Sequence, residues 1–256
     1  MGKTIFITSG KGGVGKTTIT AYLAYMLGEA GKRVCIVDAD IGLKNMDVLL
    51  GVENRVLYDG EDVLSGKCSL ASALVVDKRV KNISLLTLKK SMKSSTFTLQ
   101  DFVSLMLLLK SDFEYILVDS PAGVESGFKF GMEICDEALV ITQLEASALS
   151  DADRVIAILQ GSMKPIKVIY NRVSPPLIKK GVQIDIQKAH EYMGVELGGI
   201  VYESDELLHI SNKGMLPRLE KGMIYKCFVC IMNRLEDSEY PLPEYTSKSL
   251  FAKLIG

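Results

Sequence analysis

The stretch "TIFITSGKGGVGKTTITAYLAYML", residues 4–27, decides the fold. It begins with an apolar, β-branched run at residues 5–7, passes through a glycine-rich turn and ends in a segment whose apolar residues recur with helical spacing. The turn satisfies the pattern GxxxxGK[ST] with Gly10, Gly15, Lys16 and Thr17. Because the pattern lies directly between a predicted strand and a predicted helix, it predicts a phosphate-binding loop.

Each part of this loop has a chemical use. Glycines let successive backbone N–H groups turn inward around phosphate oxygens, and the helix N-terminus adds the positive end of its dipole. Lys16 is expected to reach the β and γ phosphates, and Thr17 to offer a hydroxyl to Mg²⁺. The predicted nucleotide-binding residues of the loop are Gly10, Lys11, Gly12, Gly13, Val14, Gly15, Lys16, Thr17 and Thr18.

The pattern of the first strand and helix recurs along the chain. Short apolar runs are followed by longer segments with helical spacing, and we find neither an internal repeat nor an interior linker. This alternation predicts a single α/β domain of the P-loop NTPase type, with a mostly parallel twisted sheet and helices on both faces. The predicted strands are residues 4–9, 33–38, 82–86, 115–119, 138–142, 167–171 and 199–201.

Composition excludes several classes of protein. Hydrophobic residues make up 48% and charged residues 24% of 256 residues, which is ordinary for a globular domain. A formal net charge of -1 gives no overall basic field, and this argues against nucleic acid as a partner. Five scattered cysteines, no secretory signal and no long apolar segment predict a cytoplasmic protein.

Acidic residues follow two predicted strands. Asp38 and Asp40 alternate at the end of one strand, and Asp119 ends the strand "YILVD". Ligands of open α/β sheets bind at the carboxyl ends of the strands, so these carboxylates are expected near the phosphate loop. An aspartate that only caps the next turn is the alternative for Asp38. Asn171 ends a further strand, and its amide suits a base edge or, alternatively, a turn.

The octapeptide "KGGVGKTT", residues 11–18, resembles the deviant Walker A ATPases, the family of MinD, ParA and the nitrogenase iron protein. The resemblance implies ATP and Mg²⁺ as ligands and a homodimer that forms with ATP. Lys11 would then cross the dimer interface to the partner's phosphates, and Asp40 would position or activate the attacking water, so that Lys11, Lys16 and Asp40 are the expected catalytic residues. Thr17, Asp38 and Asp119 would hold Mg²⁺, partly through water.

The resemblance is greatest to the division-site branch of the family and runs over essentially the whole chain, including "VDADIGLKNMDVLLG", "SPAGVESG", "DADRVI" and "SLFAKLIG". It implies a MinC-like inhibitor of division as partner, a MinE-like activator or a polar anchor, and a peripheral location on the inner face of the cell membrane. It also implies nucleotide contacts from Glu145, Asn171, Arg172 and Glu203. Leu144 and Tyr202 depart from the family pattern, which has proline at both places.

The C-terminus predicts a second functional element. On a helix, the apolar residues of "SLFAKLIG" fall within an arc of roughly 140°. We expect an ATPase domain at residues 1–235, a linker at 236–247 and an amphipathic tail helix at 248–256 that binds an anionic membrane surface; packing of the tail on its own domain is the alternative. The predicted membrane contacts are Leu250, Phe251, Lys253, Leu254 and Ile255.

Several readings compete with this one. A regulator of flagellar number or placement would share the fold, the ATP site and the tail. An iron-sulfur carrier would use Cys227 and Cys230, but their spacing favours a buried helix face, and His190 and His209 are too isolated to suggest zinc. DNA partitioning would require a basic patch. Asp151 is a candidate partner contact or, equally, a solvated residue at a helix start.

Overall fold

The computed structural model of the chain describes residues 1–39, 46–88, 98–121, 123, 126–205, 207 and 221–245. Within these described ranges, eight strands form one sheet in the order β3-β4-β2-β5-β1-β6-β7-β8, and neighbouring strands are parallel except β3 and β4, which are antiparallel. This confirms the predicted α/β class. The strands are β1 (Lys3–Thr8), β2 (Val34–Asp38), β3 (Val75–Val76), β4 (Ile83–Thr87), β5 (Tyr115–Asp119), β6 (Glu137–Thr142), β7 (Ile166–Val173) and β8 (Glu196–Tyr202).

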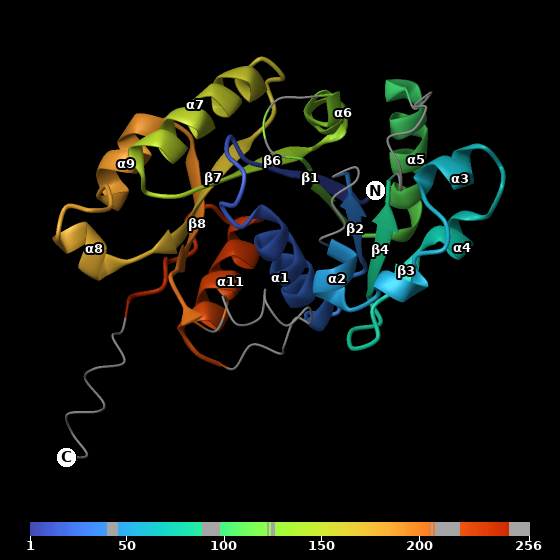
Figure 1. The fold of residues 1–256 in the computed structure, drawn as a ribbon, viewed down its shortest axis with the longest axis horizontal. Helices are drawn as coiled ribbons and strands as arrows, with labels where there is room; N and C mark the ends of the chain where they lie inside the picture. Colours follow the sequence, from blue (N-terminus) through green and yellow to red (C-terminus); the bar gives the residue numbers. More distant parts are fainter. Residues whose placement is uncertain are drawn as a thin grey trace.

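Helices cover both faces of this sheet (Figure 1). The connections from β4 through β8 advance in one direction along the sheet, whereas β1 to β2 goes in the other, so right-handed crossovers put their helices on opposite faces. The helices are α1 (Lys16–Glu29), α2 (Met46–Leu50), α3 (Gly60–Leu64), α4 (Leu70–Ala73), α5 (Leu99–Asp112), α6 (Ser126–Ile134), α7 (Ala146–Gln160), α8 (Pro175–Lys179), α9 (Ile186–Met193) and α11 (Met223–Arg234), with a short 3-10 turn η1 (Glu53–Arg55).

Helix α1 is buried more completely than its spacing predicts. The sequence indicates one apolar face, but every residue from Ile19 to Gly28 is buried because α2 and α11 pack on the side away from the sheet. Tyr22 of α1 stacks against Phe228 of α11 with ring centroids 5.0 Å apart. The helix ends before Gly31, whose φ of +85° is the left-handed conformation expected after a helix C-terminus. The start of α1, and with it the phosphate loop, is therefore anchored in the core.

Three features of the sheet differ from the predictions. The antiparallel edge strand β3 is not predicted, because two residues give no periodic signal. Strand β8 begins at Glu196 rather than at residue 199, and β7 continues past Asn171 to Val173 through an irregular register. The glycines at 198 and 199 hide the start of β8 from propensity rules.

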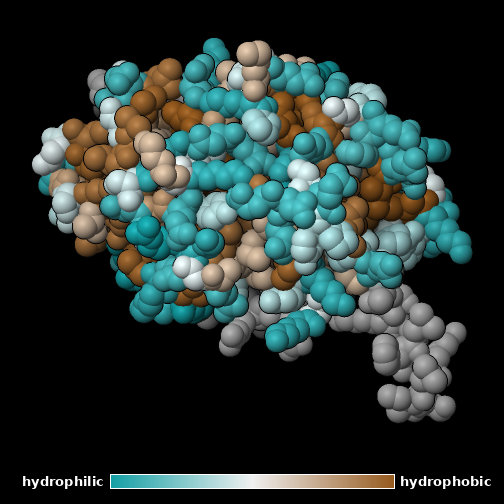
Figure 2. Space-filling model, turned by 180° about the vertical axis from the view of Figure 1, so that it is seen from behind, coloured by the Kyte–Doolittle hydropathy of each residue, from teal (hydrophilic) through white to brown (hydrophobic). Residues whose placement is uncertain are grey.

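The rear face mixes hydrophilic and hydrophobic residues (Figure 2). Helix α5 buries Phe102, Leu105, Met106 and Leu109, while Leu107 and Leu108 are about half exposed.

Among the described residues, no helix is long and apolar enough to cross a membrane. The predicted tail helix, with Leu250, Phe251, Lys253, Leu254 and Ile255, lies outside the described residues.

Candidate nucleotide-binding site

The phosphate loop lies at the carboxyl ends of the central strands. It follows β1, whose neighbours β5 and β6 are parallel to it, and the loop leads directly into α1. Strand β2 pairs with β5 in a register that sets Asp38 opposite Asp119. Both carboxylates are buried, at 6% and 1% exposed. The two predicted strand-end aspartates therefore meet beside the loop.

Asp119 is the centre of the polar contacts below the loop. The hydroxyl of Thr17 donates to its Oδ2 at 2.8 Å, and Lys16 Nζ lies 3.6 Å from its Oδ1. Thr20, one helical turn after Lys16, donates to the same Oδ1 at 3.1 Å. Lys16 is itself only 8% exposed. A buried cation, a hydroxyl and a carboxylate are thus held together at the start of α1.

Two glycines give the loop the shape that it needs. Gly13 and Gly15 have φ of +77° and +95°, values that residues with a side chain rarely adopt. Gly15 is the N-cap of α1, and no side chain caps the helix there. The amide groups of the first turn therefore remain available for an anion.

Gly10 is required for a different reason. A Cβ at this position would lie 2.2 Å from the carbonyl oxygen of Asp151, on α7. The start of the loop therefore packs directly on the backbone of α7. Asp151 is predicted to be either a partner contact or a solvated residue at a helix start. The structure places its backbone against the loop and its carboxylate 3.9 Å from Arg154 Nη1, with the side chain 36% exposed.

Lys11 faces outward, in contrast to Lys16. Its side chain is 46% exposed, and its Nζ lies 3.4 Å from Ser147 Oγ and 4.0 Å from Glu145 Oε2. Glu145 is the N-cap of α7, and its side chain is 52% exposed. The structure thus brings Lys11 and Glu145 together at the surface of one chain.

A pocket of about 260 Å³ opens next to the loop. Its walls come from the start of α1, the end of β7, the end of β8 and α11. It contains three of the residues predicted for the base side, namely Asn171, Arg172 and Glu203. The remaining lining residues are Gly15, Thr18, Ile19, Tyr202, Ser204, Leu207 and Phe228. A half-apolar pocket adjoining a phosphate loop has the chemistry that a base and ribose require.

Asn171 fastens the loop to β7. Its Nδ2 donates to the carbonyl oxygen of Val14 at 2.7 Å, and its Oδ1 accepts from the backbone N–H of Arg172 at 2.9 Å. Arg172 has a φ of +54°, so the chain turns sharply at this point. One amide hydrogen of Asn171 is therefore used by the loop, and a second remains for a ligand.

The donor atoms present fit a magnesium ion bound with phosphate. Mg²⁺ prefers hard oxygen ligands, and Thr17, Asp38 and Asp119 supply a hydroxyl and two carboxylates at one edge of the sheet. Lys16 and the open amides at the start of α1 supply the positive field for phosphate oxygens. Asp40, predicted to act on the attacking water, lies outside the described residues.

Comparisons with known proteins agree with this site. The CobQ/CobB/MinD/ParA nucleotide binding domain matches residues 5–217. The septum site-determining protein MinD of Bacillus subtilis is 39% identical over 99% of this chain and 97% of its own length. This chain belongs to the MinD/ParA family of P-loop ATPases. MinD of Helicobacter pylori is 42% identical, over 98% of this chain and 97% of its own.

Solved structures of the MinD/ParA family share the fold. In a MinC:MinD complex of Aquifex aeolicus, the matching chain has a TM-score of 0.86 and 37% identity, covering 96% of this chain and 100% of that chain. MinD of Pyrococcus horikoshii, solved with Mg-ADP, has a TM-score of 0.79 and 28% identity, covering 93% and 97%. The resemblance drawn from "KGGVGKTT" is thereby confirmed.

The two departures from the family pattern have different surroundings. Leu144 is fully buried, and its carbonyl oxygen accepts from the N–H of Ile184 at 2.9 Å. Tyr202 lines the pocket and donates from its hydroxyl to the carbonyl oxygen of Pro243 at 3.1 Å. Burial raises the pKa of Tyr202, which favours the protonated hydroxyl that donates this bond.

Sequence reasoning missed several residues of the site. Thr20 was detectable, because it lies one helical turn after Lys16 and so faces the same carboxylate. Gln183 was not, since it reaches back nine residues to bind the N–H of Ser174 and the carbonyl of Arg172. Leu207 and Phe228 come from distant segments, and only the fold brings them to the pocket.

The paired cysteines belong to the core rather than to the site. Cys227 and Cys230 lie on α11 and are 0% and 1% exposed, as the helical spacing predicts. Burial raises the pKa of Cys227 to about 11, which disfavours the thiolate that a metal would need. No group of three or more metal-binding side chains occurs within the described part of the chain.

Proposed function

We propose that this chain is an ATPase of division-site placement whose binding to ATP and Mg²⁺ drives homodimerisation and reversible membrane attachment. The observation that carries the proposal is the difference between the two lysines of the loop. Lys16 is buried against Asp119 within its own subunit, whereas Lys11 is half exposed beside Glu145. One lysine is placed for the subunit's own nucleotide, and the other lies at the surface, where a second subunit can reach it.

The chain's own groups suit phosphoryl transfer. Lys16 and the first-turn amides of α1 hold the β and γ phosphates, and Thr17, Asp38 and Asp119 hold the cation. When bound, Mg²⁺ offsets the negative charge of the phosphates. Lys11 adds a second cation only after dimerisation, since its ammonium lies at the surface of one chain. Hydrolysis by the isolated subunit is therefore slow.

The tail is proposed to convert dimerisation into membrane binding. One short amphipathic helix binds weakly, because the free energy needed to order it is about equal to the free energy gained by burying its few apolar side chains. Two tails on one dimer make the second insertion intramolecular, which raises avidity by roughly 10² or more. Lys253 supports an anionic surface as the target.

The proposed partner is a MinC-like inhibitor of division-ring assembly. Support comes from the solved complex of MinC with MinD in Aquifex aeolicus, whose MinD chain is 37% identical to this one. A MinE-like activator or a polar anchor would then set where the dimer is released. A role in flagellar placement would share this chemistry, and it is distinguished by phenotype: deletion should give polar minicells.

The test is phosphate release measured with and without anionic liposomes. We expect the wild type to hydrolyse ATP slowly and to sediment with liposomes in ATP but not in ADP. Lys11→Ala should bind ATP yet fail to dimerise, and removal of residues 248–256 should abolish sedimentation while leaving dimerisation intact. Lys188→Ala, at an exposed lysine of α9, is the matched control. Equal sedimentation in ATP and ADP would contradict the proposal.

A further inference from the structure

Residues 236–245, which we call the strap, follow α11. They contact the sheet at the amino end of its strands and again at the carboxyl end. Ser238 Oγ donates to Glu196 Oε2 at 2.6 Å, at the start of β8. Seven residues later, Tyr245 stacks on Tyr202, at the end of β8, with ring centroids 5.0 Å apart. The strap therefore runs along the length of β8, from the edge opposite the phosphate loop to the edge that holds the pocket.

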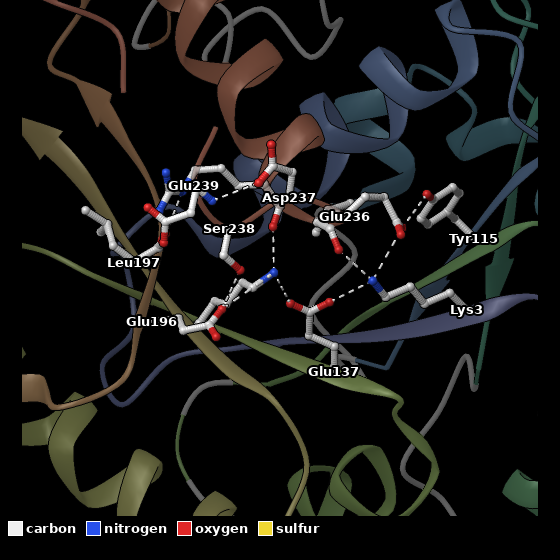
Figure 3. Close-up of polar contacts among 12 residues, drawn as sticks. Lys3, Tyr115, Glu137, Glu196, Leu197, Glu236, Asp237, Ser238 and Glu239 are labelled. Atoms are coloured by element: carbon white, nitrogen blue, oxygen red, sulfur yellow. Dashed lines mark hydrogen bonds and ion pairs between the residues drawn. The ribbon is translucent and has the colours of Figure 1, made fainter. Parts of the chain in front are cut away.

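The first residue of the strap, Glu236, is held by a network of charged residues (Figure 3). Glu236 accepts from Tyr115 at 2.9 Å and lies 3.4 Å from Lys3 Nζ. Lys3 also donates to the carbonyl oxygen of Leu235 at 2.7 Å and pairs with buried Glu137 at 3.0 Å. Since these partners begin strands β5, β1 and β6, the last turn of α11 and the start of the strap are tied to the amino ends of the central strands.

The last residues of the strap, Pro243 to Tyr245, are held by Tyr202. Its hydroxyl donates to the carbonyl oxygen of Pro243, and its ring packs on that of Tyr245. Tyr202 is only 6% exposed, although it lines the pocket beside the phosphate loop. A proline at this place, as the family resemblance leads one to expect, has no hydroxyl for such a bond. The hydroxyl of Tyr202 thus ties the wall of the pocket to the strap.

The strap has a turned first half and a stiff second half. The N–H of Tyr240 donates to the carbonyl oxygen of Asp237 at 3.1 Å, so residues 237–240 form a turn. Pro241 and Pro243 each fix φ near the extended polyproline value, so residues 241–243 are stiff. Because the turn and the two prolines limit the conformations of the strap, loosening of its start at Glu236 is expected to loosen its end at Tyr245.

The strap also shares a second, polar pocket with the loop after β8. This pocket of about 240 Å³ is lined by Val173, Ser174, Pro175, Glu203, Ser204, Asp205 and Tyr245. Glu203 and Ser204 line the first pocket as well. Tyr245 thus lines a pocket together with the same short loop that forms one wall of the proposed base site.

We propose that the strap is an outer support of the base pocket, and that Tyr202 links occupancy of this pocket to docking of the strap. The inference rests on the proposed function, because the pocket is taken as the base side of an ATP site. A base that packs against Tyr202 favours the ring position in which the strap is docked. By thermodynamic reciprocity, a docked strap strengthens binding of the base. Residue 245 lies three positions before the predicted tail at 248–256, so the nucleotide would set the position of the chain shortly before the tail.

The test compares binding of Mg-ADP with binding of magnesium pyrophosphate to the full chain, by titration calorimetry. Pyrophosphate occupies the phosphate loop but has no base. Tyr202→Phe removes one hydroxyl, and Tyr115→Phe removes the hydroxyl that holds Glu236 at the far end of the strap. Each should raise the Kd for ADP about two- to tenfold, the range of one hydrogen bond, and leave the Kd for pyrophosphate unchanged. Tyr192→Phe, at an exposed tyrosine of α9, is the control.

A second measurement reports on the strap itself. A glutamate-specific protease should cut after exposed Glu244 and release residues 245–256, seen as a loss of intact mass. We expect Mg-ADP, but not pyrophosphate, to slow this cut in the wild type and not in Tyr202→Phe. The inference is overturned if Tyr202→Phe weakens both ligands equally, if it weakens neither, or if ADP leaves the cut unchanged. A wild type that binds neither ligand would instead contradict the proposed function.

Discussion

Thr17 Oγ1 donates to Asp119 Oδ2 at 2.8 Å, so the residue that ends β5 and the second residue of α1 are bonded across the edge of the sheet. Lys16 Nζ lies 3.6 Å from the other carboxylate oxygen. The cation, the hydroxyl and the carboxylate of the site therefore hold one another. The bonds that hold the site together are also those that a magnesium ion and a phosphate would take over.

Replacing Asp119 by alanine should therefore destabilise the protein as well as inactivate it. The variant leaves the buried ammonium of Lys16 without its carboxylate, and losing one partner of a buried pair costs about 3–5 kcal/mol. We expect a lower urea midpoint and no ATP hydrolysis.

The hydroxyl of Thr17 is expected to be needed for hydrolysis. Thr17→Ser, which keeps the hydroxyl, should retain most of the stability and most of the ATP hydrolysis, whereas Thr17→Val should lose hydrolysis. Equal activity of the serine and valine variants would show that the hydroxyl is not needed.

Gly10→Ala should destabilise the domain by about 1–3 kcal/mol, the usual cost of overpacking. The added Cβ would meet the backbone of α7 at Asp151, which cannot move aside like a flexible side chain. Gly12→Ala is the matched control, since a Cβ there meets nothing within 4 Å. Thermal unfolding of the two variants checks this directly. Similar melting temperatures would mean that the loop does not need its close approach to α7.

Glu236 should make the docking of α11 sensitive to acid. Burial alone would raise its pKa, but the hydrogen bond from Tyr115 and the charges of Lys3 and Lys167 outweigh burial and lower the pKa below its ordinary value of 4.5. A lowered pKa contributes stability that is complete above the ordinary value and is lost as the pH falls through the folded-state value. Besides Lys3, Lys167 and Tyr115, the buried carboxylate of Glu137 faces the same network.

The measurement is urea unfolding of the wild type and of Glu236→Gln at about pH 6 and about pH 3.5. Wild type should be more stable than Glu236→Gln at the higher pH, and the difference should shrink at the lower pH, because the carboxylate takes up a proton as the pH falls. Glu239→Gln, at an exposed neighbour, controls for a general change in net charge. A stability difference that does not depend on pH would rule out this contribution of Glu236.

The parts of the site that could be predicted are those set by chain direction. Asp38 and Asp119 each end an apolar strand, and carboxyl ends of parallel strands meet at one edge, so their proximity follows from the sequence alone. The strap contact of Tyr202 could not be predicted, because it depends on where α11 ends relative to β8. The two-residue strand β3 was missed for lack of any period, and the burial of α1 on all sides depends on α2 and α11.

The bond that Asn171 makes within the protein is another contact that could not be predicted from the sequence. The sequence predicts a base contact, whereas the structure also uses its amide to hold Val14 at 2.7 Å, a partner 157 positions away. Asn171→Ala should therefore weaken binding of pyrophosphate as well as of ADP, because the whole loop loses its tie to β7. A bond of this kind is worth about 1 kcal/mol, so both Kd values should rise about fivefold.

Calorimetry of the two ligands on Asn171→Ala decides between the roles. A residue that only contacts the base would change the Kd for ADP and leave pyrophosphate unaffected, which is the pattern expected for Tyr202→Phe. Gln187→Ala, at an exposed residue of α9 that does not line the pocket, is the control. If Asn171→Ala, like Tyr202→Phe, raises the Kd for ADP and leaves the Kd for pyrophosphate unchanged, the bond to Val14 does not shape the loop. Asn171 would then act only as a contact to the base.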